Sequence, residues 1–296
     1  MSLYESGVRQ IIDDFLVEES KAVRDYGDYW SASSAGYCMR KTILERLGLP
    51  KLNEDPRKQR VFTSGHVFHD WIQQLTKKAG ISIAQEVELQ DEELMIRGHF
   101  DDLILIEEEL PDLPYGDDDK GKGGKFDPTR PEQHLILYDY KTVNSRSFMW
   151  AKKNGNKMSY FHRMQLGTYM YMLRNGSESI KPNEHTTQFA EQETRSRETK
   201  WSRFAYPQLQ EARILKIEKD ALMMGEQQLF WDDELSREIL DYWTTLNKYW
   251  NEKKMPPCTC ADQEGGFMAK EKWNPFYYNG EPCSVEYYKK WKEGLK

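Results

Sequence analysis

The chain has 296 residues and carries 42 Lys and Arg against 49 Asp and Glu, a formal charge of −7. No apolar stretch approaches the ~20 residues that span a bilayer, and residues 1–15 lack the apolar core of a signal peptide, so a cytoplasmic protein without membrane contact is expected. Four cysteines are too few for a secreted disulfide scaffold, which leaves metal ligation or burial.

Helical periodicity dominates both ends of the chain. Residues 8–49 are predicted to be helical, with the serines among residues 31–34 capping the second part. Residues 61–79 form the next predicted helix, whose apolar face carries Val67, Trp71 and Leu75. Helices are also predicted over 158–174 and 235–250, the last with an apolar face of Leu235, Ile239, Tyr242, Leu246 and Tyr249.

Strand periodicity occupies the middle of the chain. Alternating apolar and polar residues predict strands over 83–89, 94–106, 135–141 and 212–218. Two polar stretches, 107–134 and 175–210, are expected to be mobile insertions. Strands interleaved with helices predict an α/β fold with a central mixed β-sheet flanked by helices. We expect one domain over 1–296, divided into an N-terminal helical part (1–80), a core (81–225) and a C-terminal helix and cysteine-containing tail (226–296).

Charged side chains gather in two of the predicted strands. The segment GHFDD places Asp101 three residues after Gly98, and YDYKT places Asp139 and Lys141 two residues apart, on one face of a strand. Because an unpaired buried charge is costly, the pair favours a cleft that admits a cation. Two carboxylates and a histidine such as His69 are suitable ligands for Mg²⁺ or Mn²⁺. Such an ion can polarise a phosphodiester, and a nearby lysine can orient the attacking water.

Each pattern alone has an ordinary structural explanation. Asp139 and Lys141 can form an exposed salt bridge, Asp101 can belong to a turn, and a helical histidine usually has a structural partner. The order of four short motifs is more specific. G-x-x-x-H covers residues 65–69 and is followed by G-x-x-D (98–101), D-x-K (139–141) and Q-x-x-x-Y (165–169).

This ordered set resembles the PD-(D/E)XK nuclease superfamily in its RecB-like branch. It is similar to the iron–sulfur nucleases associated with CRISPR systems and to related phage exonucleases. The resemblance implies a restriction-endonuclease-like core and a metal-dependent deoxyribonuclease. We expect an exonuclease that acts on single-stranded DNA ends in phage or prokaryotic recombination, repair or replication, with DNA and proteins of those pathways as partners.

The resemblance also implies a role for each matched residue. The implied ligands of Mg²⁺ or Mn²⁺ are His69, Asp101, Asp139 and the backbone carbonyl of Tyr140. Lys141 would serve the attacking water, and Gln165 and Tyr169, about one helical turn apart, would position DNA or that lysine. Glu86, in the preceding strand, either supports the site or is a solvated strand residue. His66 is a rival ligand to His69.

The four cysteines are split between the two ends of the chain. Cys38 lies early, and the tail holds Cys258, Cys260 and Cys283. In the iron–sulfur members of the resembled branch, one early and three late cysteines hold a 4Fe-4S cluster that joins the chain ends. The count is the same here, although the spacing in the tail differs. A 4Fe-4S cluster is therefore expected, with a tetrahedral zinc ion or four free thiols as alternatives.

Cations beside aromatic rings mark the expected nucleic-acid contacts, because bases stack on rings while phosphates are neutralised. The residues concerned are Arg40, Lys41, Trp150, Lys152, Lys153 and Arg163. Solvated helix faces with core aromatics explain the same pattern. Three other functions stay open: a structure-specific endonuclease acting on flaps or branches, a DNA-end-binding adaptor subunit with a vestigial site, and an iron–sulfur protein with no nucleic-acid role.

Overall fold

The structure of the chain is a computed structural model that describes residues 7–20, 27–52, 56–108, 132–153, 155–175, 206, 209–262, 270 and 274–294. Its elements are, in chain order, α1 (Val8–Ser20), β1 (Trp30–Ser31), the 3-10 helix η1 (Ala32–Ser34), α2 (Met39–Arg46), α3 (Pro56–Lys78), β2 (Ser82–Asp91), β3 (Ile96–Glu108), β4 (Glu132–Val143), α4 (Ser145–Lys153), α5 (Tyr160–Asn175), β5 (Glu211–Glu218), β6 (Met224–Phe230), α7 (Asp233–Asn251) and α8 (Val285–Gly294). Most of the two expected insertions lies outside the described residues.

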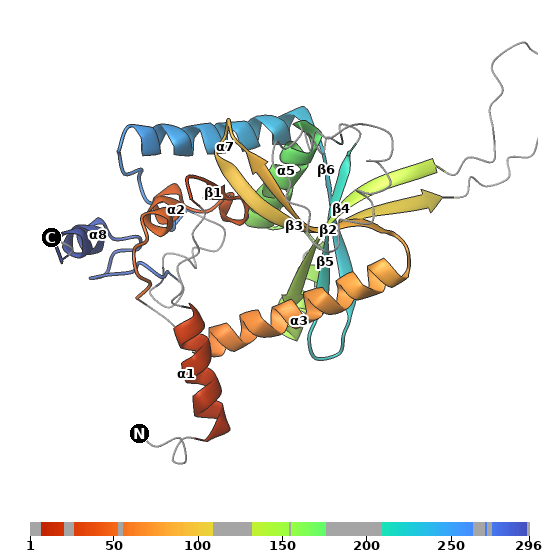
Figure 1. The fold of residues 1–296 in the computed structure, drawn as a ribbon, viewed down its shortest axis with the longest axis horizontal. Coiled ribbons are helices and arrows are strands. Elements are labelled where there is room, and N and C mark those ends of the chain that lie inside the picture. The colour runs from red at the N-terminus through yellow and green to blue at the C-terminus, as the bar shows by residue number, and fades with distance from the viewer. Residues whose placement is uncertain are drawn as a thin grey trace, which may run out of the picture.

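Six strands form one mixed sheet, with β3 as its longest strand (Figure 1). One edge of β3 pairs with β2. The other edge pairs with β1 at Ile96 and Arg97 and with β4 from Asp102 onward. Residues 98–101 of that edge therefore belong to neither ladder. β5 continues the sheet parallel to β4, and β6 pairs antiparallel with β5.

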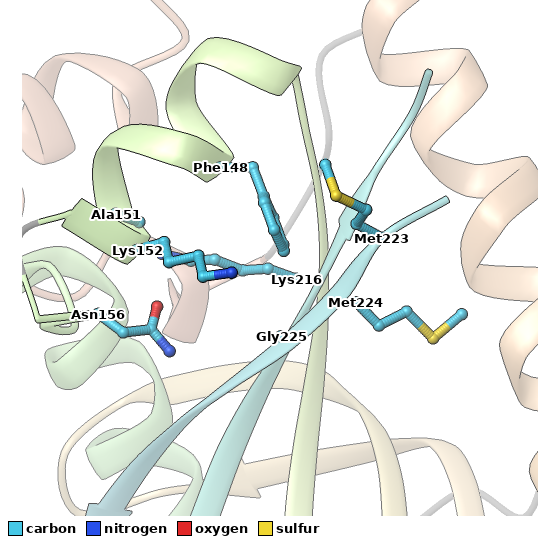
Figure 2. Close-up of a pocket in the computed structure, with 8 residues that line it drawn as sticks. All are labelled: Phe148, Ala151, Lys152, Asn156, Lys216, Met223, Met224 and Gly225. Atoms are coloured by element: carbon cyan, nitrogen blue, oxygen red, sulfur yellow. The ribbon is translucent and has the colours of Figure 1, made fainter. Parts of the chain in front are cut away.

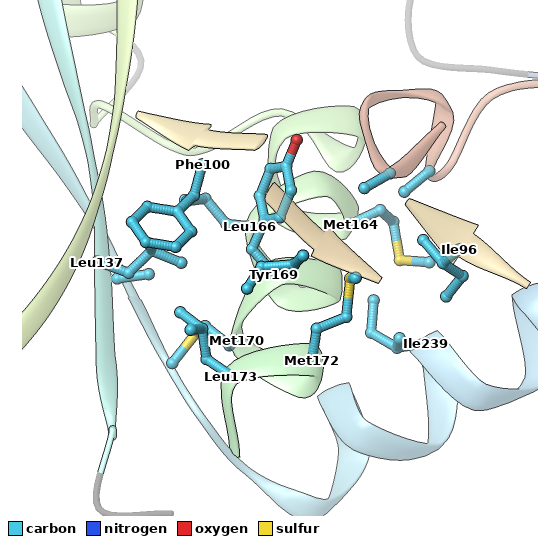
Figure 3. Packing of buried hydrophobic residues seen from close by; sticks show 14 of the residues in the cluster. Ile96, Phe100, Leu137, Met164, Leu166, Tyr169, Met170, Met172, Leu173 and Ile239 are labelled. Atoms are coloured by element: carbon cyan, nitrogen blue, oxygen red, sulfur yellow. The ribbon is translucent and has the colours of Figure 1, made fainter. Parts of the chain in front are cut away.

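Helices cover both faces of the sheet because successive residues of a strand point to opposite sides (Figure 1). On β4, Ile136, Tyr138 and Tyr140 cluster with Ile72 of α3. The neighbouring Leu137 joins the larger core under α5 and α7. Figure 3 shows that core, with sheet residues packed against the side chains Met164, Leu166, Met170 and Leu173 of α5 and Ile239 of α7. Polar residues that alternate with Leu137 therefore face α5.

Helices α5 and α7 approach closely at one glycine. A Cβ atom on Gly167 would lie 2.9 Å from Leu235 Cδ1 and 3.1 Å from Ile239 Cδ1. Asp232 caps α7, since its side chain accepts a hydrogen bond from the Leu235 amide at 2.7 Å. The predicted apolar face of α7 is confirmed, with Leu235, Ile239 and Leu246 fully buried.

The expected fold class, a mixed sheet flanked by helices whose two ends meet at the cysteines, is also confirmed. The prediction of a helical segment over 8–49 is wrong between α1 and α2. Trp30 and Ser31 form β1 there, and Cys38, rather than a serine, precedes the first residue of α2. Trp30 is 1% exposed, and its amide donates to the Met95 carbonyl at 2.6 Å. Burial of this large ring against the sheet outweighs local helical preference.

The predicted apolar face of α3 is wrong as well. Val67 is 64% exposed, and Trp71 and Leu75 are also exposed. Phe68 and Ile72 face the sheet instead. In this orientation His69 and Gln73 point toward the strands. The helix therefore presents a partly polar face to residues 98–101 of β3.

Candidate active site

Three carboxylates lie in a row across β2, β3 and β4. The β2–β3 register sets Glu86 opposite Asp101, and the β3–β4 ladder stops one residue short of pairing Asp101 with Asp139. The Tyr140 amide donates to Asp101 Oδ2 at 2.6 Å, in place of a further ladder bond. Glu86 has a φ of 49°, a conformation that costs a non-glycine residue about 1–2 kcal/mol. The strands thus separate where the carboxylates meet.

Asp139 is the centre of a polar cluster on the α5 face. Its Oδ1 accepts hydrogen bonds from Lys141 Nζ at 3.0 Å and from Gln165 Nε2 at 3.1 Å. Its Oδ2 lies 2.9 Å from Lys141 Nζ but outside hydrogen-bond geometry, and it accepts no hydrogen bond from the described residues. Asp139 is only 4% exposed. A buried carboxylate oxygen without a donor is an acceptor suited to a hard divalent cation.

Helix α3 brings two polar side chains to the same place. His69 Nδ1 lies 3.6 Å from Asp101 Oδ2, and the His69 ring lies edge-on to the Tyr140 ring, with 6.0 Å between the ring centroids. Gln73, one turn later, donates to Glu86 Oε1 at 2.6 Å and to the Asp101 carbonyl at 3.1 Å. The residues predicted to bind a cation are therefore neighbours in space.

These side chains do not form a closed cage. Over the part of the chain that the structure describes, the cysteines are the one set of three or more Cys, His, Asp or Glu residues whose ligand atoms converge tightly. Asp101 and Asp139 would have to draw together around an ion. Both residues lie where the β3–β4 ladder ends, beyond its last pair Asp102–Tyr138.

The charges of the cluster are strongly coupled. Burial, and then the charge of Asp139, raise the pKa of Asp101 well above its usual range. Burial alone would lower the pKa of Lys141, but Asp139 and Asp101 outweigh it and raise that pKa, so the ammonium form persists. Burial and then Lys141 lower the pKa of His69, which leaves the neutral ring that binds metals. A cation would relieve the repulsion between the two carboxylates.

This coupling predicts a pH dependence of stability. Because the pKa of Asp101 is raised in the fold, its protonated form contributes stability that is present below the ordinary carboxyl pKa of about 4 and is lost as pH rises through the native pKa. We expect Asp101→Asn to gain stability relative to wild type as pH rises from about 5 to 8. Urea unfolding in cation-free buffer measures this, and a pH-independent difference would contradict it. Added Mn²⁺ should stabilise wild type more at the higher pH.

Gly98 sets the distance between β3 and α5. A Cβ atom there would lie 2.7 Å from Ala32 Cβ and 3.0 Å from Tyr169 Oη. Tyr169 is 3% exposed, and burial raises its pKa well above the usual value, so its hydroxyl stays protonated. The second and fourth motifs, at residues 98–101 and 165–169, thus meet through a close contact that only glycine permits.

We expect Gly98→Ala to destabilise the protein by roughly 1–3 kcal/mol, because the added methyl group overlaps neighbours that cannot all move. Ala32→Gly removes one of the two contacts, so the double variant should recover part of the loss. Urea midpoints of the single and double variants measure both effects. Equal stability of Gly98→Ala and wild type would contradict the close contact.

Asp102 supports the site from the opposite face. Its carboxylate is fully buried and accepts hydrogen bonds from four side chains, those of Tyr140 at 2.8 Å, Thr76 at 2.7 Å, Ser82 at 2.5 Å and Gln85 at 3.1 Å. The network ties β4 to α3, β2 and β3 at the position next to Asp139. It therefore holds the backbone from which the catalytic candidates project.

The predicted nucleic-acid contacts divide into two groups. Arg40 donates to the Pro256 carbonyl at 2.7 Å, and Lys41 pairs with Glu45 at 2.7 Å, so both have partners within the chain. Arg163 pairs with Glu238. The exposed members lie together near the end of α4 and are Trp150, Lys152 and Lys153. His66, the rival ligand, is exposed, with its ring 6.4 Å from that of His69.

The sequence prediction did not include His162 of α5, whose ring is acted on by the charges of the site. Its Nδ1 is buried and has no hydrogen-bond partner among the described residues. Burial, and then the charge of Lys141, lower its pKa to about 4, and the charges of Asp139 and Lys216 also act on it. The signal was its position three residues before Gln165, on the same helix face. Gln73 likewise lies on the same helix face as His69, four residues later.

The four cysteines form a second candidate site, at the junction of the two chain ends. Their Sγ atoms all lie within 4.8 Å of one another, with 3.9 Å between Cys38 and Cys258 and 3.5 Å between Cys260 and Cys283. All four are free thiols. Asn274 donates to the last two sulfurs, and an apolar cluster that includes Leu44, Leu49 and Phe276 surrounds the group.

The donor set fits a metal centre. Proximity to Cys258 and the other thiols lowers the pKa of Cys38 far below its usual range, and similar contacts lower the pKa of Cys258 to about 7. The same contacts raise the pKa values of Cys260 and Cys283, because the protons are shared unequally among four adjacent thiols. Four thiolates around one tetrahedral ion at 2.3 Å stand roughly 3.8 Å apart, close to the two short spacings. A four-iron cluster gives each thiolate its own iron and needs the sulfurs farther apart. The cysteines can therefore hold one ion as they stand, or a cluster after spreading.

No protein-family model matches the chain, and no curated protein sequence does. Among solved structures, the crystal structure of SSO0001 matches with a TM-score of 0.42 and 11% identity, over 86% of this chain and 90% of that chain. LHK-Exo in complex with dAMP matches with a TM-score of 0.42 and 12% identity, over 79% and 93%. The alkaline exonuclease LHK-Exo from Laribacter hongkongensis matches with a TM-score of 0.38 and 14% identity, over 80% and 97%. Likenesses this distant carry no argument about function, so the site's own geometry must supply it.

Every helix in the described part of the chain is too short or too polar to span a bilayer.

Proposed function

We propose that the protein is a metal-dependent deoxyribonuclease that hydrolyses phosphodiester bonds from single-stranded DNA ends. The observation that carries the proposal is the arrangement around Asp139. Its buried Oδ2 has no hydrogen-bond donor among the described residues, Asp101 lies on the neighbouring strand, and Lys141 holds its ammonium 2.9 Å from that oxygen. Beside this ion pair, the second buried carboxylate of Asp101 leaves an excess of negative charge that a cation would balance.

The proposed ligands of the cation, Mg²⁺ or Mn²⁺, are His69, Asp101, Asp139 and the carbonyl of Tyr140. When bound, such an ion withdraws charge from the phosphodiester and favours ionisation of nearby water. Lys141 keeps its proton and can donate to a phosphate oxygen or orient the attacking water. Gln165 fixes the rotamer of Asp139 through its hydrogen bond. Glu86 and Gln73 hold β2 and α3 against the Asp101 backbone.

The exposed residues near the end of α4 support a single-stranded substrate. Trp150, which is 64% exposed, and the two lysines that follow it offer a ring for stacking and cations for phosphates. Such an activity suits the processing of DNA ends in phage or prokaryotic recombination, repair or replication, where protein partners would deliver those ends.

A comparison of linear and circular single-stranded DNA tests this function. With Mg²⁺ or Mn²⁺, we expect end-labelled linear DNA to be shortened and closed circular DNA to stay intact, because an exonuclease needs an end. Cleavage of circles or of flaps and branches would replace the proposal by a structure-specific endonuclease. Binding of ends with no cation-dependent cleavage would replace it by an adaptor with a vestigial site.

We further propose that the cysteine site holds a structural metal centre, either a 4Fe-4S cluster or a zinc ion. Hydrolysis requires no change of redox state, so the centre has no step to perform in it. Its position between α2 and the tail joins the chain ends, and α8 lies close to α2 there (Figure 1).

A further inference from the structure

A groove lies between α4 and the β5–β6 hairpin, and none of the proposed cation ligands lines it. Its volume is about 450 Å³, and Figure 2 shows the residues that line it, which are Phe148, Ala151, Lys152, Asn156, Lys216, Met223, Met224 and Gly225. The lining contains two ammonium groups and no carboxylate. Its remaining side chains are mainly apolar, so the groove combines positive charge with an apolar surface.

The groove adjoins the candidate active site on the same face of the sheet. β5 runs parallel to β4, and Lys216 is the register partner of Lys141. The two lysines therefore project to the same side from neighbouring strands. The charge of Lys216 also acts on His162, together with Lys141 and Asp139. A chain whose phosphodiester lies at Asp139 would continue over Lys216 in one direction.

Phe148 forms the aromatic wall of the groove and packs against the backbone at a glycine. Gly225 on β6 pairs with Lys216, and a Cβ atom there would lie 3.4 Å from Cε2 and Cζ of Phe148. The ring of Phe148 thus packs over the hairpin backbone without a side chain beneath it. Met223, which is 40% exposed, continues this apolar surface at the hairpin (Figure 2).

The far wall is held in place by hydrogen bonds. The Asn156 side chain donates to the Glu226 carbonyl at 2.5 Å. Gln227 donates from Nε2 to the carbonyls of Asn156 at 2.7 Å and of Lys157 at 2.6 Å. These bonds fix the segment after α4 to β6. The groove is therefore formed before any ligand binds, which reduces the entropy cost of binding.

We propose that this groove binds one nucleotide of single-stranded DNA next to the phosphodiester that is cut, with its phosphate at Lys152 and Lys216 and its base against Phe148 and Met223. A nucleotide suits this lining because it joins an anionic phosphate to a flat apolar base, and because Lys216 is the neighbour of Lys141 in the candidate active site. The inference rests on the proposed nuclease function and identifies where its substrate lies.

Binding of fluorescent oligodeoxythymidine to the full chain tests the groove. All variants carry Asp139→Ala so that the DNA is not cut. We expect Lys216→Gln and Phe148→Ala each to weaken binding roughly tenfold, the scale of one phosphate contact or one stacked base. Lys216→Gln should also lower the slope of log affinity against log salt by about 0.7, whereas Phe148→Ala should leave that slope unchanged. Phe148→Leu keeps an apolar side chain if the alanine variant unfolds.

Lys78→Ala is the matched control, because this exposed lysine lies at the end of α3, on the opposite face of the sheet. It should change neither affinity nor slope at the groove. With Asp139 intact, the groove variants should raise KM and leave kcat within about twofold. If the folded groove variants keep the wild-type affinity and KM while the wild-type protein cuts DNA, the groove is not a nucleotide site. The proposed nuclease function would then still stand. Weakened binding in the groove variants, together with a wild-type protein that never cuts DNA, would support the groove as a binding site and contradict the nuclease function.

Discussion

Asp139→Asn is expected to reduce phosphodiester cleavage by at least about a thousandfold, the cost of removing a central electrostatic group from an active site. The substitution keeps the volume of the side chain but removes the charge that pairs with Lys141 and would face a cation. Lys141→Met should cause a comparable loss, because no other described ammonium lies within salt-bridge distance of Asp139. The initial rate of cleavage of end-labelled single-stranded DNA measures both effects.

Asp241→Asn is a suitable control, since this exposed carboxylate lies on α7 and takes no part in the site. It should leave the rate unchanged. Urea unfolding must show that each variant is folded under the assay conditions. A folded Asp139→Asn protein that keeps more than a tenth of the wild-type rate would place the chemistry elsewhere in the molecule.

Cys38→Ser should release the metal centre and lower Tm by about 10 °C, which corresponds to roughly 3–5 kcal/mol for a domain of this size. The substitution removes the one ligand that α2 contributes, so the tail loses its link to the N-terminal part. Metal and sulfide analysis of anaerobically purified protein, together with thermal unfolding, measures both consequences. Iron with equimolar sulfide indicates a cluster, and zinc without sulfide indicates a single tetrahedral ion.

Thr259→Ala is the control for this substitution, because Thr259 is exposed and lies between two of the cysteines. It should retain both metal and Tm. A metal-free wild-type protein as stable as the Cys38→Ser variant would show that the four thiols are simply buried.

Strand and helix periodicity predicted which candidate residues share a face, whereas their choice as site residues rested on the resemblance to a nuclease family. Asp139 and Lys141 alternate with the buried residues of β4, and Gln165 and Tyr169 lie one turn apart on α5, so spacing alone placed each pair on one face. The gap on the edge of β3 was not predictable. It depends on where β1 and β4 stop pairing, which is a tertiary property.

Other features escaped prediction for physical reasons that differ. β6 has the sequence MGEQQLF, whose polar residues suit an edge strand but give no apolar alternation. The two residues of β1 are too few to show a period. On α3, the sheet accepts His69 and Gln73 at a partly polar contact, and an apolar stripe on the same helix stays exposed. Apolar periodicity identifies a helix face correctly only where the contact itself is apolar.

The most direct test of the central claim is cation-dependent cleavage of end-labelled single-stranded DNA by purified wild-type protein beside Asp139→Asn. Shortening of the DNA by wild type with Mn²⁺ or Mg²⁺, its absence with a chelator, and its absence in the variant are the predicted results. Intact DNA with wild type under every cation, or equal cleavage by both proteins, would contradict a nuclease site at Asp101, Asp139 and Lys141.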